Sequence, residues 1–431
     1  MINCYKGMQI PTVEQALSVL RGNNEMRPIY VDYDKVLMNI FSLGKIINEL
    51  TSKFMELTGV PLFKDTVLDS YAREHGFIEL FDRTPTNGIS HSVESIEKVL
   101  LNERLTKQDI EVVKSYHEVV RAKSARATMI GLLQNPISNK VSCDGHRMLE
   151  LHPDWSPQNT GRVAMSRPAV QNFRRELQEV ITVPMGYKLI HCDSGQVEPR
   201  ITYSAFVTDQ QIKTLINLYD DAYFGVLHYC TMPQSDIDSG RLDFKKMELT
   251  DEMKNNRGRI KTHGNAVMYG STKEEDNIKS AMIKRIGNHP ARLELLSKIE
   301  YDIDRGRTVF PTYFGTPIDI TKSPKLAGDV DNRRYQLVKL AINNPIQGTA
   351  ADLMRVSLLE ANRLIMGTKD SSIIAYIHDA GLFCVNENDY DKIGKELEDI
   401  VAYNVDNWIP VHAEAEVYSF NPNGAFAKYK Y

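Results

Sequence analysis

The sequence is poor in cysteine and has no long apolar run. Its five cysteines among 431 residues form no CxxC pair and no cluster with histidine, which favours reduced thiols and speaks against a structural zinc site. No apolar stretch reaches the roughly 20 residues that a membrane-spanning helix needs, and the amino terminus lacks a basic segment followed by an apolar one. We therefore expect a cytoplasmic protein without membrane association.

A large excess of basic charge is also missing. The chain has 52 Lys and Arg residues against 56 Asp and Glu residues, a net charge of −4. Basic side chains gather instead in two stretches, which hold Lys107, Lys114, Arg121, Lys123 and Arg126, and then Lys254, Arg257, Arg259 and Lys261. Because local basic faces decide affinity for phosphates, the net charge does not exclude a nucleic-acid-binding protein.

Two short apolar runs each lead to an aspartate. The pair at 189–190 predicts a buried strand that ends at Asp193, and Gly195 then permits a sharp bend. Late in the chain, apolar runs on both sides of 378–381 predict a hairpin with Asp379 at its tip. Aspartates on adjacent strand ends can hold two divalent cations about 3.5–4 Å apart, which drive displacement at phosphorus. A turn former or a helix cap is the alternative for each aspartate.

A third stretch lies between these aspartates. On a helix, Arg257, Lys261 and Asn265 recur every fourth residue and share one face, about 6 Å apart along the axis. Such a row suits a polyphosphate chain. Tyr269 ends the row, and we expect Gly270 to close the helix as a left-handed cap. A solvated basic helix is the alternative.

These stretches carry a resemblance to a known family. The segments Asp193-x-x-Gln-Val-Glu-x-Arg200, Arg257-x-x-x-Lys261 with Tyr269-Gly270, Asn343-Asn-Pro-Ile-Gln-Gly-Thr-Ala-Ala-Asp352 and His378-Asp379 resemble, in this order, the signature motifs of the family A DNA polymerases. Upstream, Thr160-Gly-Arg162 and Pro168-Ala-Val-Gln-Asn172 resemble the motif at the start of that family's palm. The resemblance runs from about residue 27 to the C-terminus. The motif Gln-x-Glu-Pro-Arg at 196–200 resembles that of the short family A polymerases of bacteriophages and mobile elements.

The resemblance implies a mixed α+β fold of the right-hand polymerase type, with a helical thumb, an antiparallel-sheet palm and helical fingers. We expect an N-terminal extension at 1–27, the thumb at 28–155, the palm at 156–205 and 335–431, and the fingers at 206–334. Apolar periodicity predicts thumb helices after Asp32 up to Gly59 and at 66–74, 92–103 and 107–133. Elsewhere we expect an irregular stretch at 135–166, a hairpin at 309–320, a strand at 408–417, and helices at 173–182, from a capping box at Thr208, from Thr349 and at 389–405.

The resemblance also assigns roles to residues. Asp193 and Asp379 would hold two Mg²⁺ ions, with the Ser194 carbonyl as a further ligand and Mn²⁺ as an alternative metal. Arg257 would fork onto the phosphates, while Lys261 would offer a point charge and a proton for the departing pyrophosphate. Further contacts with the nucleotide are expected from Gln196, Glu198, Asn265, Tyr269 and Tyr223. Contacts with primer-template DNA are expected from Arg162, Arg200, Asn343, Gln347 and His378.

Glu198 discriminates between polymerase classes. A side chain of that size beside the incoming sugar would collide with a 2′-hydroxyl, whereas the similar single-subunit phage RNA polymerases typically carry a small residue there. Three positions depart from the family pattern. Tyr223 stands where the family often has a triphosphate-binding histidine, Asn265 where it has Phe or Tyr against the sugar, and Ala380 where an acid follows Asp379.

We therefore predict a template-directed DNA polymerase that adds dNTPs to a primer 3′ end by two-metal-ion phosphoryl transfer. We also expect no proofreading exonuclease activity, because only a few dozen residues precede the expected thumb in this sequence. A processivity or primase partner is left open, and a phage or mobile-element origin would place the protein in a bacterial cytoplasm. The alternatives are a weak or inactive polymerase-fold protein that binds nucleic acid, a single-subunit RNA polymerase relative, and a nuclease that uses the same aspartates.

Overall fold

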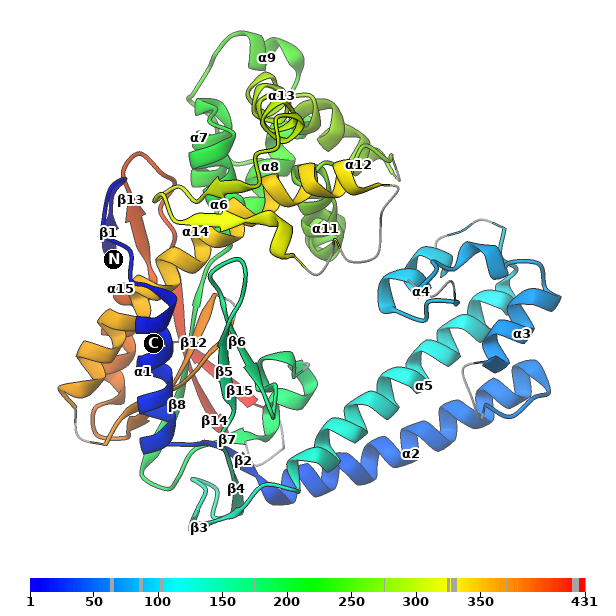
Figure 1. Cartoon of the computed structure of the whole chain (residues 1–431), viewed down its shortest axis with the longest axis vertical. Helices are drawn as coiled ribbons and strands as arrows, with labels where there is room; N and C mark the ends of the chain where they lie inside the picture. Colours follow the sequence, from blue (N-terminus) through cyan, green and yellow to red (C-terminus); the bar gives the residue numbers. More distant parts are fainter. Residues whose placement is uncertain are drawn as a thin grey trace. The chain divides into compact units, whose positions relative to one another are not determined.

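The computed structural model describes residues 1–62, 66–84, 88–100, 102, 104–173, 175–274, 276–323, 326, 332–368, 370–377, 379–420 and 426–430. It combines helices with mostly antiparallel sheets, which confirms the predicted α+β class (Figure 1). The chain forms two compact units. The first comprises Met1–Pro28, His152–Asn172 and Gly186–Tyr431, and the second Ile29–Leu151 and Phe173–Met185. Among the described helices, none has both the length and the apolar character needed to cross a membrane.

Within its described residues, the second unit joins a small sheet to four α-helices. The helices are α2 (Tyr33–Thr58), α3 (Thr66–Glu74), α4 (Val93–Leu100) and α5 (Lys107–Leu132). The strands β2 (Ile29–Asp32), β3 (Ile137–Val141), β4 (Arg147–Leu151) and β7 (Ile181–Thr182) form an antiparallel sheet in the order β3-β4-β2-β7. Helices α2 and α5 lie side by side (Figure 1) and share an apolar core that includes Phe54 and Tyr116. The helices predicted for this region are confirmed.

The ends of α2 show why it forms where the sequence predicts. The side chain of Asp32 accepts a hydrogen bond from the Lys35 amide at 2.9 Å, which satisfies one of the free donors of the first turn. At the other end, Gly59 has a φ of 70°, a left-handed conformation that glycine adopts without steric cost.

Two predictions for this part of the chain are wrong. The stretch 135–166 is not irregular, because it forms β3, β4 and a hairpin of β5 (Asp154–Pro157) with β6 (Val163–Ser166). The stretch 173–182 is not a helix, since only a 3₁₀ turn at Arg175–Val180 precedes β7. Ile181 there pairs with Val31. Strand partners of this kind override a local helical pattern, and they are not visible in the segment itself.

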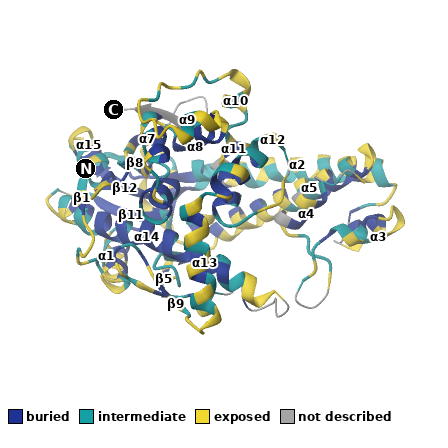
Figure 2. Ribbon diagram, turned by 90° about the horizontal axis from the view of Figure 1, so that it is seen from above, coloured by how far each residue is buried: buried dark blue, intermediate teal, exposed yellow. Residues whose placement is uncertain are grey.

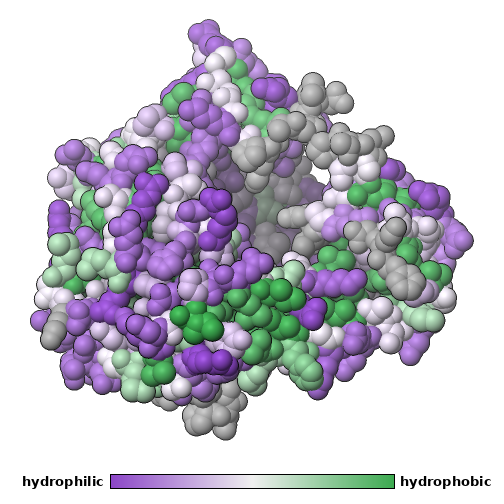
Figure 3. All heavy atoms as spheres, turned by 60° about the horizontal axis from the view of Figure 1, so that its bottom comes forward, coloured by the Kyte–Doolittle hydropathy of each residue, from purple (hydrophilic) through white to green (hydrophobic). Residues whose placement is uncertain are grey.

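Large apolar side chains also lie on the surface. Figure 3 shows a face that is mostly hydrophilic, with smaller apolar areas. In the second unit, Met38 is 69% exposed, Phe41 66% and Ile137 57%. The Lys45 ammonium lies 4.6 Å from the centre of the Phe41 ring, so part of this apolar surface is covered by a cation. These residues contribute nothing to the core of their unit.

The first unit is centred on a five-stranded antiparallel sheet in the order β11-β12-β8-β14-β15. Its strands are β8 (Tyr187–Ser194), β11 (Ser372–Ile377), β12 (Ala380–Asn386), β14 (Ala413–Phe420) and β15 (Phe426–Lys430). Strand β8 lies between β12 and β14, so residue 193 has neighbours on both sides. The strand to Asp193 and the hairpin around Asp379 are thus confirmed.

Residues 1–27, which the sequence leaves unexplained, belong to this unit. Strand β1 (Ile2–Cys4) pairs in parallel with β13 (Tyr403–Val405). Helix α1 (Val13–Met26) packs against β11 and against α14 (Arg333–Met366), the long helix that Figure 2 shows largely buried. Helix α15 (Tyr390–Val401) packs on β8 and β14.

A group of helices completes the first unit. They are α6 (Val197–Ile201), α7 (Gln210–Leu218), α8 (Ala222–Thr231), α9 (Gln234–Asp238), α10 (Asp251–Asn255), α11 (Arg257–Met268), α12 (Asn277–Met282) and α13 (Pro290–Asp304). Helices α7, α8 and α11 share a core that includes Leu215, Tyr223 and Ile260. The predicted hairpin at 309–320 is present as β9 (Val309–Pro311) and β10 (Pro317–Asp319).

Several predicted boundaries in this unit are wrong. Asp209, not Thr208, caps α7, since its carboxylate accepts from the Ile212 amide at 2.9 Å. The helix expected from Thr349 already begins at Arg333 and runs through Pro345, whose carbonyl accepts from the Thr349 hydroxyl at 2.7 Å. At the C-terminal end, α15 stops at Val401, and the last long strand begins at Ala413.

Gly348 fixes how closely α14 approaches its neighbours. A methyl group there would stand 2.3 Å from Ile318 Cδ1 and 2.9 Å from Thr312 Cγ2. We expect Gly348→Ala to lower the free energy of unfolding by about 1–3 kcal/mol through overpacking. The matched control is Gly22→Ala in the exposed part of α1, where nothing lies within 4 Å of the added methyl, and which should raise stability by about 0.5–1 kcal/mol. Denaturant unfolding of both variants measures the difference, and equal effects would contradict the packing argument.

Candidate active site

Two strand ends bring the predicted metal-binding aspartates together. Asp193 is the residue before the end of β8, and its partner in the register is Ala380, the residue after Asp379. The Ser194 amide donates a hydrogen bond to the Asp379 carbonyl at 3.0 Å. On the other side of Asp193, strand β14 places Glu414 opposite it. This end of the sheet therefore gathers the oxygen donors that hard divalent cations prefer.

The bend after β8 lies one residue later than predicted. Gln196, not Gly195, has the left-handed backbone, with a φ of 54°. That conformation costs a non-glycine residue about 1–3 kcal/mol. Glycine fits position 195 for another reason, since a methyl group there would lie only 3.1 Å from the His412 carbonyl oxygen. The Gln196 side chain is also occupied, because its Oε1 accepts a hydrogen bond from the Ala222 amide at the start of α8.

Glu198 is held between two residues from distant parts of the chain. Arg162 Nη2 lies 2.6 Å from one carboxylate oxygen, and the Tyr269 hydroxyl donates to the other at 2.9 Å. Burial, together with the charge of Glu198, raises the pKa of Tyr269 above its usual range. Tyr269 therefore remains a hydrogen-bond donor, and the position of Glu198 is fixed from both sides.

The predicted row on α11 is present, and α8 contacts two of its members. Arg257 forms an ion pair through Nε with Asp221. Asn265 Oδ1 accepts a hydrogen bond at 3.1 Å from Tyr223, which is only 4% exposed. Burial raises the pKa of Tyr223 to about 12, so its hydroxyl keeps its proton. Lys261, between the two, is exposed, and the row ends as predicted near Gly270, whose φ is 101°.

Arg200, predicted to contact DNA, lies inside the protein. It is 3% exposed, and its guanidinium donates to the carbonyls of Gly195, Pro410 and Asp220 at 3.0, 3.2 and 3.1 Å. Burial lowers the pKa of Arg200. These bonds join the turn after β8 to the start of α8, and they argue against the predicted contact with DNA.

Asn343 and Gln347 are four residues apart on α14, so they lie on one face of the helix. Both are half-buried. In the described structure, the buried Oδ1 of Asn343 has no hydrogen-bond donor, which leaves an acceptor available to a ligand. His378, the remaining predicted contact with DNA, is outside the described residues.

A buried ion pair supports the turn that carries Arg162, and no pattern in the sequence predicts it. Arg355 pairs with Asp352 and also donates to the carbonyls of Gly161 at 2.6 Å and Pro11 at 2.8 Å. The Thr312 hydroxyl donates to the same aspartate at 2.5 Å. Burial raises the pKa of Asp352 and lowers that of Arg355, so each depends on its partners to stay charged. The network joins α14 to residues 11 and 161.

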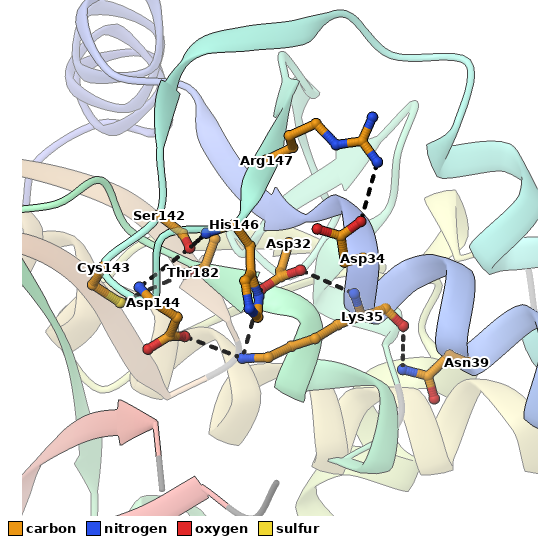
Figure 4. Close-up of polar contacts among 10 residues, drawn as sticks. All are labelled: Asp32, Asp34, Lys35, Asn39, Ser142, Cys143, Asp144, His146, Arg147 and Thr182. Carbon is orange, nitrogen blue, oxygen red and sulfur yellow. Dashed lines mark hydrogen bonds and ion pairs between the residues drawn. The ribbon is translucent and has the colours of Figure 1, made fainter. Parts of the chain in front are cut away.

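A second acidic group lies in the other unit and is paired with other side chains of that unit. The ligand atoms of Asp32, Asp34 and His146 lie within 4.8 Å of one another. Figure 4 shows that His146 contacts Asp32, at 2.7 Å, and that Arg147 contacts Asp34, at 3.2 Å. Asp32 also caps α2. These contacts explain the cluster as part of the structure of its unit.

Comparisons with known proteins fit this arrangement. Residues 309–419 match the model of the DNA polymerase family A. The DNA polymerase I of Pseudomonas aeruginosa is 21% identical over 335 residues, which cover 73% of this chain and 33% of that protein. The thermostable DNA polymerase I of Thermus filiformis is 23% identical over 433 residues, 94% of this chain and 47% of that protein.

Part of this chain is thus similar to the family A DNA polymerases. The solved structure of the POL domain of Pol1 from M. smegmatis, in complex with DNA primer-template and dNTP, shares its fold with a TM-score of 0.70 at 20% identity, over 94% of this chain and 68% of that one. The chain spans from one third to about half the length of these curated polymerases. Family A polymerases generally use divalent metal ions, and the acids at the end of β8 and beside β12 fit such ions.

Removing one partner of the buried pair of Arg355 and Asp352 should lower the stability of the protein. We expect Arg355→Ala to lower the free energy of unfolding by about 3–5 kcal/mol, because it leaves Asp352 buried without its partner. Arg355→Met with Asp352→Leu should cost clearly less. The control, Arg334→Ala on the same helix, breaks an exposed pair with Asp304 and should change stability by at most about 1 kcal/mol. Denaturant unfolding tests this, and similar losses for Arg355→Ala and Arg334→Ala would refute it.

Proposed function

We propose that the chain is a template-directed DNA polymerase that adds deoxynucleotides to the 3′ end of a primer. The observation that carries this proposal is a continuous set of contacts within the first unit. It begins at Gln196, in the turn that follows Asp193, continues to Ala222 and Asp221 at the start of α8, and reaches Arg257 on the face that carries Lys261. Acids suited to divalent metals are thus tied to cations suited to a triphosphate, as phosphoryl transfer requires.

The metal ligands in this proposal are Asp193, Asp379 and the Ser194 carbonyl, which would hold two Mg²⁺ ions or Mn²⁺ in their place. When bound, such ions supply charge neutralisation at the attacking primer oxygen and at the departing pyrophosphate. Strand pairing between β8 and β12 keeps the two carboxylates on neighbouring strand ends. The chain's own task is to hold them there, and to keep primer and nucleotide in line.

Cations on α11 would bind the nucleotide. The Arg257 guanidinium can fork onto phosphate oxygens, while exposed Lys261 offers a compact charge and a proton for the departing pyrophosphate. Asn265 presents an amide to the same face. Gln196 and Tyr223 have other partners in the structure, so we assign them to positioning α8 and Asn265 instead of direct contact with phosphate.

The nucleotide sugar would meet Glu198. Arg162 and Tyr269 hold this carboxylate in place, and a fixed side chain excludes a 2′-hydroxyl better than a mobile one. Primer-template DNA would contact Arg162, whose guanidinium is partly exposed, and Asn343 and Gln347 on α14.

We also propose which parts of the two units form the palm, the fingers and the thumb. The sheet of the first unit, with residues 1–27 and α14, would form the palm, and the helices from α7 to α13 would form the fingers. The second unit, with its long helices α2 and α5, would be the thumb. Basic side chains along α5, such as Lys114 and Arg121, would then face duplex phosphates.

Extension of a labelled primer by the purified protein, with dNTPs and Mg²⁺, tests the activity. We expect Asp193→Asn and Asp379→Asn each to reduce the extension rate more than about 100-fold, because each removes charge that holds the metals. Asp391→Asn, an exposed aspartate of α15, should extend like the unaltered protein. No extension by the unaltered protein, with binding of primer-template retained, would favour an inactive DNA-binding protein instead.

Sugar selection is tested separately. We expect Glu198→Ala to lower the preference for dNTP over rNTP by about 10- to 200-fold, the range for one steric contact in a pocket. Tyr269→Phe keeps the size of Glu198 and removes only one hydrogen bond, so its effect should be smaller. Single-turnover incorporation of matched dNTP and rNTP measures both. An unchanged ratio for Glu198→Ala would remove Glu198 from this role.

A further inference from the structure

The start of α8 contacts the row of Arg257, Lys261 and Asn265 on α11 at two points. Asp221 reaches Arg257, and Tyr223 reaches Asn265. The two contacted residues are eight positions apart, about two turns of helix or 12 Å. The turn itself is held in place, because the Ala222 amide bonds to Gln196, and Ala222 and Tyr223 are 0% and 4% exposed. The turn is therefore a fixed base against which the row can be aligned.

Both oxygens of the Asp221 carboxylate have a partner. Oδ1 accepts a hydrogen bond from the Tyr223 amide at 3.0 Å and so caps α8, while Oδ2 pairs with Arg257. The Asp221 side chain is only 17% exposed. The carboxylate is therefore bound to the helix start on one side, and it cannot follow the arginine if the arginine moves.

The contact uses one particular nitrogen of Arg257. Asp221 meets Nε, while the two Nη groups make no hydrogen bond with any described residue, and the Arg257 side chain is 42% exposed. A guanidinium has five donors in a rigid plane. With Nε held by Asp221, the Nη edge remains without a partner among the described residues, and that edge has the geometry to bind two phosphate oxygens at once.

We propose that Asp221 is a positioning residue for nucleotide binding, which orients the guanidinium of Arg257 so that its Nη edge meets the triphosphate. Tyr223 aligns Asn265 in the same way from the same turn. The inference rests on the proposed function, since the phosphates are those of the incoming dNTP. Asp221 would thus favour the binding of a negatively charged triphosphate although it is itself an acid. It aligns the Arg257 guanidinium and leaves the Nη edge of that group free to bind phosphate.

The opposite role for Asp221 would be that of an internal competitor, displaced from Arg257 when the triphosphate binds. A competitor would occupy the Nη edge and would be free to leave. The contact at Nε and the second bond to the α8 cap favour positioning. The two roles predict opposite signs, since loss of a positioning residue weakens nucleotide binding and loss of a competitor strengthens it.

The test is single-turnover incorporation of a matched dNTP on a primer-template, which separates the dissociation constant from the maximal rate. Asp221→Asn keeps the cap, because asparagine is a good capping residue, and removes the charge that orients Arg257. We expect the dissociation constant to rise about 2- to 10-fold, the range for the lost order of one side chain, with the maximal rate nearly unchanged. The melting temperature should not change.

The matched control is Asp209→Asn. Asp209 caps the preceding helix α7 by the same kind of bond, to the Ile212 amide at 2.9 Å, and its other oxygen lies 3.5 Å from His289 Nε2. This variant should bind the dNTP like the unaltered protein. A second control is Arg257→Lys, which keeps the charge but has no Nε–H, so adding Asp221→Asn to it should weaken binding no further.

The possible results distinguish a failure of the positioning role of Asp221 from a failure of the proposed polymerase function. Weaker dNTP binding by Asp221→Asn, absent in the Arg257→Lys background, supports the inference. Unchanged or tighter binding by Asp221→Asn, while Arg257→Ala weakens binding, overturns the positioning role and leaves the polymerase proposal standing. Unchanged binding by Arg257→Ala would overturn both the inference and the proposed role of Arg257.

Discussion

The pairing of β8 with β12 and β14 is the constraint on which the site depends. Its register sets Ala380 and Glu414 beside Asp193, and the Ser194 amide bonds to the carbonyl of Asp379. In an antiparallel sheet a slip of one residue would turn every side chain to the other face. The backbone hydrogen bonds of three strands therefore hold carboxylates at one end of the sheet, although like charges repel one another there.

Around this end, the protein holds its charged groups by giving each one a partner from a distant segment. Arg162 and Tyr269 bond to Glu198, Arg355 bonds to Asp352 and to two backbone carbonyls, and Arg200 donates to three carbonyls. Such groups are costly to bury alone and become rigid when every donor is satisfied. The same contacts make residues 1–27 part of the site's support, because Pro11 accepts one of the bonds from Arg355.

Two of the three positions that depart from the family pattern contact each other in the structure. Tyr223 and Asn265 bond to each other, so two departures that are unrelated in the sequence form one contact. Asp193 has Ala380 as its partner on strand β12 and Glu414 as its partner on strand β14. An acid is therefore present on the β14 side of Asp193, whereas the residue after Asp379 on the β12 side is not an acid. Both arrangements shape the surroundings of the proposed nucleotide without changing the two aspartates or the α11 cations.

Local features were determined by the sequence itself, because a strand or helix follows from the period of its side chains. The strand to Asp193, the hairpin around Asp379 and the spacing of Arg257 and Lys261 on one helix face could all be predicted. Contacts between distant segments were decided only by the tertiary structure. Three examples are the buried position of Arg200, the contact of Arg162 with Glu198 and the ion pair of Asp221 with Arg257. They depend on how strands and helices pack, and no short stretch of sequence contains that information. Short strands such as β5 and β6 escaped prediction for the same reason, since a strand of four residues is stabilised chiefly by its partner.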